Sequence, residues 1–144
     1  MLFVRKMEPE KKKKIRTVSG LHAYDDEYYK REYNKESAKH FINYVKDVKQ
    51  IIQDKKWNLQ TKYNKHYVGY KAGFFNAFGI KWVGSKTFAF FFKLSEEEAN
   101  LENIHMTKYE SQWKEAVYYI DPQKTKTKDF MKLFEKAYKK LTGE

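Results

Sequence analysis

The 144-residue sequence has no cysteine, only two prolines and no long apolar run. Without cysteine, the chain can form neither a disulfide bond nor a thiolate metal site. No apolar stretch approaches the roughly 20 residues that a membrane-spanning helix needs, and the first residues lack the apolar region of a signal peptide. We therefore expect a cytoplasmic protein that does not contact the membrane.

The sequence also lacks the patterns that mark common active sites. Its four histidines are far apart and show no metal-ligand spacing, and no glycine-rich loop leads into Lys-Ser or Lys-Thr, as in a phosphate-binding loop. A restriction-type nuclease needs Glu-x-Lys on a strand near an aspartate, but Glu115 is followed by Ala116 and Val117. We expect that the protein is not an enzyme and that it holds neither a metal nor a cofactor.

Positive charge, in contrast, is abundant. The chain has 30 lysine and arginine residues against 19 aspartate and glutamate residues, which gives a formal net charge of +11. Such an excess favours an anionic partner, with nucleic acid as the first candidate and an acidic protein as the second. A lysine-rich surface that reflects only a biased composition is the alternative.

Part of this charge is concentrated near the start of the chain, at Lys11, Lys12, Lys13, Lys14 and Arg16. We expect residues 1–20 to form a flexible basic arm that contacts phosphates, with a purely solvated terminus as the alternative. Residues 21–144 are long enough for one domain with its own core.

Apolar periodicity predicts two long helices. Between residues 35 and 54, apolar side chains recur at three- and four-residue spacing, and Asn34 can cap the start of this helix. The second helix closes the chain at Leu141, and Thr125 or Thr127 is expected to cap it. We expect the apolar stripes of both helices to cover one face of a sheet.

Two shorter segments carry signals of helix starts. Residues 21–34 predict a short helix or an ordered arm, and the acidic cluster at residues 25–27 would lie at its N-terminus, where the helix dipole favours negative charge. Ser95 with Glu98 resembles a capping box that opens a short helix.

The stretch from Lys62 to Leu94 is rich in aromatic residues, has no acidic residue and is interrupted by turn signals. It predicts most of an antiparallel sheet, with strands at 58–63, 66–72, 75–83 and 86–94 and a fifth strand at 112–120. The expected fold class is α+β, with a single five-stranded, mostly antiparallel sheet and the helices packed on one face.

Turn chemistry then gives a register. Two-residue loops at Asn64-Lys65, Gly73-Phe74 and Gly84-Ser85 would place alternate side chains on the same face of the sheet. One face becomes the core, and the other collects four rings and three lysines, namely Tyr67, Phe78, Trp82, Phe91, Lys62, Lys71 and Lys93. Aromatic rings surrounded by lysines suit single-stranded nucleic acid, because bases stack on the rings and ammonium groups meet the phosphates. A second core layer would have the same sequence pattern, so both interpretations stay open.

These observations predict a nucleic-acid-binding module without sequence specificity, which contacts single-stranded or structured DNA or RNA through the second sheet face and the basic arm. A module that docks an acidic protein is the alternative.

The segments HYVGYKAGFFNAFGIKW and TFAFFFKLS, the Trp113–Ile120 strand and the helix DFMKLFEKAY resemble a family of small uncharacterised domains. Some members are labelled "predicted transport protein", and others are appended to restriction-type or other DNA-processing enzymes. The similar positions are Tyr67, Gly69, Tyr70, Lys71, Phe75, Ile80, Phe92, Leu94, Val117, Asp129, Leu133, Ala137 and Tyr138. The resemblance implies an accessory domain of a DNA-processing system, and it implies no catalytic residues.

Overall fold

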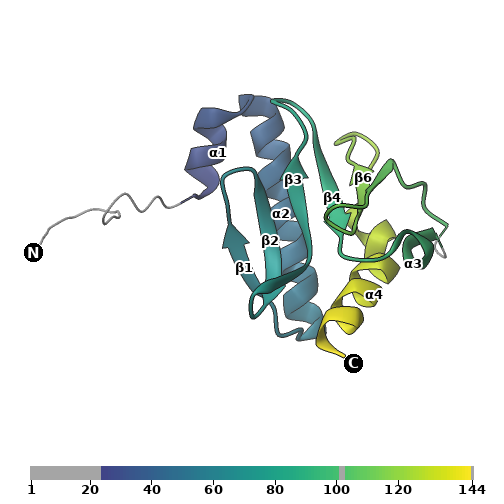
Figure 1. Cartoon of the computed structure of the whole chain (residues 1–144). Coiled ribbons are helices and arrows are strands. Elements are labelled where there is room, and N and C mark those ends of the chain that lie inside the picture. The colour runs from purple at the N-terminus through teal and green to yellow at the C-terminus, as the bar shows by residue number, and fades with distance from the viewer. Residues whose placement is uncertain (1–23, 101–102, 144) are drawn as a thin grey trace, which may run out of the picture.

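A computed structural model describes residues 24–100 and 103–143. This part of the chain forms an α+β fold with four α-helices and one antiparallel sheet of six strands in the order β1-β2-β3-β4-β6-β5 (Figure 1). In chain order the elements are α1 (Asp26–Glu32), α2 (Lys35–Lys55), β1 (Gln60–Tyr63), β2 (Tyr67–Ala72), β3 (Phe75–Trp82), β4 (Phe88–Phe92), α3 (Glu96–Asn100), β5 (Lys108–Glu110), β6 (Glu115–Tyr119), the 3-10 helix η2 (Thr127–Phe130) and α4 (Met131–Thr142).

The sheet has one strand more than the sequence predicts. The short strand β5 pairs with β6 through a tight turn at residues 111–114, although the sequence predicts no strand before residue 112 in this region. Three residues are too few for an alternation of apolar and polar side chains to be recognised. The predicted basic arm, with Lys11, Lys12, Lys13, Lys14 and Arg16, lies outside the described residues.

Most of the predicted helix caps are confirmed. The Asn34 side chain accepts a hydrogen bond from the Ser37 backbone at 3.0 Å at the start of α2. The acidic cluster lies at the start of α1 as predicted, and Asp25 in addition caps this helix, a role not predicted from the sequence. Ser95 and Glu98 form the reciprocal capping box of α3. The threonine cap of the last helix is wrong, because the Thr127 hydroxyl donates instead to Asp47 of α2 and no side chain caps η2.

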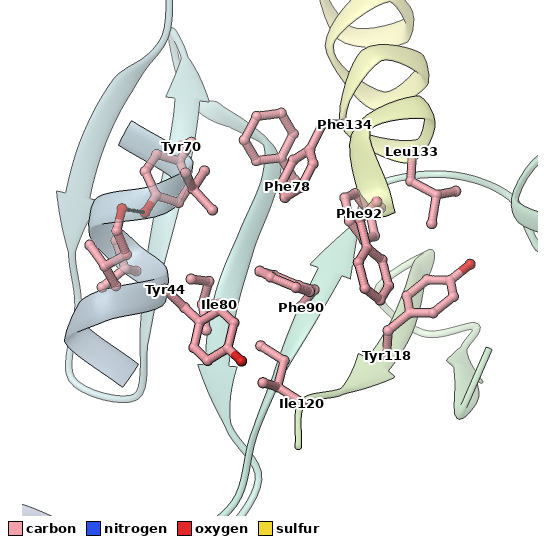
Figure 2. Close-up of a cluster of buried hydrophobic side chains, with 14 of the residues drawn as sticks. Tyr44, Tyr70, Phe78, Ile80, Phe90, Phe92, Tyr118, Ile120, Leu133 and Phe134 are labelled. Atoms are coloured by element: carbon pink, nitrogen blue, oxygen red, sulfur yellow. Dashed lines mark hydrogen bonds between the residues drawn. The ribbon is translucent and has the colours of Figure 1, made fainter. Parts of the chain in front are cut away.

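All four helices contribute to one inner core, and they lie on the same face of the sheet. Phe134 of α4 packs edge-on against Phe78 and Phe92, at centroid distances of 4.8 and 4.9 Å. Figure 2 shows these rings pointing toward one another between α4 and strands β3 and β4. The buried Tyr70 hydroxyl donates to the Val45 carbonyl of α2 at 3.1 Å, which joins this helix to β2. The prediction that the helices cover a single face is confirmed.

The predicted register is correct for β2 and β4 but wrong for most of β3. Ala72 pairs with Phe75 as expected, but a bulge follows, so that Tyr70 lies opposite Phe78 and Ala77 is an extra residue. The turn between β3 and β4 has three residues, 84–86, so Trp82 pairs with Phe88 rather than with Thr87. Each change shifts the pairing by one residue, and a shift of one residue turns a side chain to the opposite face.

The predicted register therefore assigns Phe78 and Trp82 to the wrong face. Phe78 is fully buried and Trp82 is 8% exposed, and both belong to the inner core together with Ile80. The bulge and the longer turn are favourable because burial of one large apolar side chain contributes about 1.5–3 kcal/mol. The predicted register would have turned Gly79 toward the helices in place of these rings.

Candidate nucleic-acid interface

The outer face of the sheet, which the helices leave uncovered, does not form the predicted aromatic platform. Tyr67 and Phe91 lie on it, but Phe91 is only 2% exposed. Its ring covers Gly79 so closely that a Cβ added to this glycine would lie 2.4 Å from the ring, and Tyr67 packs edge-on against Phe91 at 5.8 Å. With Phe78 and Trp82 in the inner core and Phe91 buried, Tyr67 is the one ring of the predicted four that stays partly exposed on the outer face.

The lysines at the centre of this face are neutralised by carboxylates. Lys81 contacts both Glu110 and Glu115, and Lys93 contacts Glu115 at 2.9 Å. The hydrogen bond from Lys81 holds the pKa of Glu110 below its usual value of 4.5. Burial opposes the charge of Lys81, but its hydrogen bonds to the two carboxylates outweigh that effect and raise its pKa. The middle of the outer face thus holds an ion-pair network rather than a set of unpaired lysines.

Exposed rings occur instead at one end of the sheet. Among the described residues, four large apolar side chains are exposed, and three of them, Phe74, Phe75 and Trp113, line a single cleft of about 460 Å³. The exposed fractions of these three residues are 93%, 69% and 58%. Contiguous exposed apolar side chains on a monomer mark binding surfaces, whereas scattered ones do not.

Two turns bring these rings together, and the end of a helix closes the site. Phe74 and Phe75 lie at the tip of the β2–β3 hairpin, where Gly73 adopts the positive φ of 65° that a two-residue turn requires. Trp113 lies in the β5–β6 turn, and its carbonyl accepts a hydrogen bond from Lys93 of the β4 end at 3.1 Å. The C-terminal end of α4 forms a further wall through Leu141. We name this site the aromatic cleft.

Three lysines line the aromatic cleft, namely Lys93, Lys114 and Lys140. Lys140 contacts the Glu98 carboxylate at 2.7 Å, and Lys93 is held by Glu115 as described above. Lys114 has no side-chain partner among the described residues. Each ammonium group has three donors, so the two paired lysines can still donate to a second anion. The aromatic cleft therefore combines apolar stacking surfaces with cationic donors.

Lys114 also has an unusual backbone. Its φ is 53°, in the left-handed region, which costs an L-residue with a long side chain about 1–2 kcal/mol compared with glycine. Among the described residues other than glycine, only Lys56 also has a positive φ, and it is the C-cap residue of α2. Strained residues at a ligand site motivate a hypothesis of function, and here the strain is confined to the residue that presents the free ammonium group.

The structure places the described residues of the predicted site in three settings, because Phe78 and Trp82 lie in the inner core and the others lie on the outer face or in the aromatic cleft. Lys62 and Lys71 lie on the outer face, Lys93 lines the aromatic cleft, and Lys71 lies next to it because it pairs with Asn76, another cleft residue. Tyr67 and Phe91 lie on the outer face, where Phe91 is buried and Tyr67 is partly exposed. Sequence reasoning missed Phe74, Phe75, Trp113, Lys114 and Lys140. A usable signal was present only at Phe74, since a large ring inside a two-residue turn has no sheet face on which to be buried.

The described residues form a single-sheet α+β fold whose aromatic cleft combines exposed rings with lysine side chains. Over the described residues, no helix is long and apolar enough to cross a membrane, and no group of three histidine, aspartate or glutamate side chains could hold a metal ion. No family model, curated protein or solved structure matches the chain. The resemblance to the family of small uncharacterised domains thus stays a prediction.

Proposed function

We propose that this protein binds single-stranded nucleic acid, DNA or RNA, in the aromatic cleft. The observation that carries the proposal is the convergence of three exposed rings and three lysines on one cleft. Bases stack on aromatic side chains with a contribution of about 1–3 kcal/mol per base and little sequence preference. The lysines would meet the phosphates on either side of the stacked bases.

A single strand fits this arrangement better than a duplex. In a duplex the base faces are covered by neighbouring bases, so rings such as Phe74 and Trp113 could reach them only after unstacking. The two rings come from separate turns, and unstacked bases of a flexible strand can enter between such turns. The net charge of +11 would add a long-range attraction for any polyanion, and that attraction weakens with salt.

Trp113→Ala should lower the affinity for a 15-nucleotide oligothymidylate by about 1–3 kcal/mol, the usual loss for one stacking ring. The measurement is a fluorescence anisotropy titration with labelled oligothymidylate, oligouridylate and a 15-base-pair duplex at two salt concentrations. The wild-type protein should bind both single strands more tightly than the duplex.

Tyr119→Ala is the matched control, because Tyr119 is an exposed ring, 42% accessible, that does not line the aromatic cleft. It should leave the affinity unchanged. Equal losses for Trp113→Ala and Tyr119→Ala, or no loss for either, would show that bases do not stack in the aromatic cleft. If polyglutamate displaces the oligonucleotides at comparable concentration, the protein is instead a module that docks an acidic protein.

Lys114→Gly separates the strain at the aromatic cleft from its function. Because glycine adopts a positive φ without steric cost, this change should raise the free energy of unfolding by about 1 kcal/mol while weakening oligonucleotide binding. Lys56→Gly removes the same charge and the same kind of strain at the end of α2, so it should stabilise the protein similarly and leave affinity unchanged. Urea titrations and anisotropy titrations of both variants test this pair, and equal binding by both variants would remove Lys114 from the site.

A further inference from the structure

We infer that the bound strand does not end at the aromatic cleft but continues along the solvent-exposed side of α4, whose lysines bind its phosphates. This inference rests on the proposed function, because it extends the path of the same ligand. It assigns a second contact region to the single-stranded partner, and a strand confined to the aromatic cleft would not reach that region.

The solvent-exposed side of α4 is almost uniformly basic. It carries four lysines, Lys132, Lys136, Lys139 and Lys140, and one acidic residue, Glu135. Glu135 already contacts Lys55 of α2 at 3.2 Å, so it does not neutralise this row. The opposite side of α4 is occupied by core residues such as Leu133 and Phe134. We name the four lysines the α4 lysine row.

The α4 lysine row is continuous with the aromatic cleft. Lys140 belongs to both, since it lines the aromatic cleft and lies at the end of the row. Lys132 and Lys139 are exposed and seven residues apart, and positions seven apart lie on nearly the same side of an α-helix. From Lys132 to Lys140 the helix rises about 12 Å, at 1.5 Å per residue. A strand that leaves the aromatic cleft in this direction would therefore need several more nucleotides to reach Lys132.

Two features argue that the row has more than a structural role. Lysines in the last turn of a helix complement its dipole, which accounts for Lys139 and Lys140 but not for Lys132 in the first turn. A solvated helix surface usually alternates charges of both signs, whereas Glu135 is the one acidic residue of α4. Glu98 of α3 engages part of the row, because Lys140 contacts its carboxylate and Lys136 donates to its backbone carbonyl. Lys132 and Lys139 have no side-chain partner among the described residues. The chemistry that fits a one-sided row of ammonium groups beside stacking rings is a phosphodiester backbone.

The test compares a short strand with a long one. Oligothymidylates of five and fifteen nucleotides are titrated against the full-length wild-type protein and the double variant Lys132→Ala/Lys139→Ala at several salt concentrations. Each lysine–phosphate contact to a single strand contributes about 0.7 to the slope of log affinity against log salt. The double variant should therefore reduce the magnitude of this slope by about 1.4 for the 15-mer and leave the 5-mer unchanged.

The double variant Lys35→Ala/Lys39→Ala is the control. It removes the same charge from exposed positions in the first turns of α2, at the opposite end of the molecule from the C-terminal end of α4 (Figure 1). It should change neither slope. Equal effects of the two double variants on the 15-mer, or an unchanged slope for Lys132→Ala/Lys139→Ala, would overturn the inference while binding in the aromatic cleft still stands. Failure of the wild-type protein to bind either strand would reject the proposed function itself, and the inference with it.

Discussion

Trp82→Ala is expected to lower the free energy of unfolding by about 3–5 kcal/mol, the range measured for large aromatic residues removed from cores. The Trp82 ring stacks on Tyr33 at 4.1 Å and on Phe41 at 4.7 Å, and it meets Phe88 edge-on. These contacts join α1, α2 and the β3–β4 hairpin, so truncation leaves a cavity between four elements. Urea denaturation monitored by circular dichroism measures the loss.

Two further variants show whether the loss comes from the cavity. The Trp82 indole N–H is buried and has no hydrogen-bond partner among the described residues, so Trp82→Phe removes no hydrogen bond and should cost clearly less than the change to alanine. Trp113→Ala removes an equally large ring that is 58% exposed and should alter the unfolding free energy by less than about 0.5 kcal/mol. A stability loss for Trp113→Ala as large as that for Trp82→Ala would contradict the assignment of the two tryptophans to core and surface.

Gly79→Ala should destabilise the protein by about 1–3 kcal/mol or more through overpacking. A Cβ at this position would lie 2.4 Å from the Val68 carbonyl oxygen and 2.4 Å from the Phe91 ring. The ring could move, but the carbonyl belongs to the neighbouring strand and can shift only if β2 and β3 separate. The measurement is again the midpoint and slope of urea denaturation.

Gly84→Ala is the control for this prediction, because a Cβ there meets nothing within 4 Å and the residue does not have a positive φ. Its unfolding free energy should stay within about 0.5 kcal/mol of the wild-type value. A Gly79→Ala protein as stable as Gly84→Ala would show that Phe91 does not lie on the β3 backbone and that its ring leaves the outer face open.

The sequence predicts the helices of this fold better than the pairing of its strands. A stripe at helical spacing and a capping side chain are local signals, and α2 begins one residue after its predicted cap at Asn34. Strand register depends on every residue between two strands, and here a single extra residue, Ala77, moves Phe78 and Trp82 to the other face. The error at β3 does not spread to β4, because the bulge and the three-residue turn each shift the register by one and together restore it.

The candidate site could be predicted only in its chemistry. The sequence predicts exposed rings beside lysines, and the aromatic cleft has that composition, with Lys93 shared between the predicted and the observed sets. Its location depends on the β5–β6 turn, which places Trp113 within the same cleft as Phe74 although the two residues are 39 positions apart in the chain. No local pattern encodes such a contact, since it requires the order of all six strands to be known.

Photo-crosslinking with a 15-nucleotide oligothymidylate that contains 5-iodouracil tests the central claim most directly, because this base couples to aromatic side chains that stack on it. The account predicts that peptide mapping of the cross-linked protein identifies Phe74, Phe75 or Trp113, and that Trp113→Ala lowers the yield. Cross-links confined to Tyr67 or Tyr119 on the outer face, or efficient binding without any cross-link to the three rings, would contradict it.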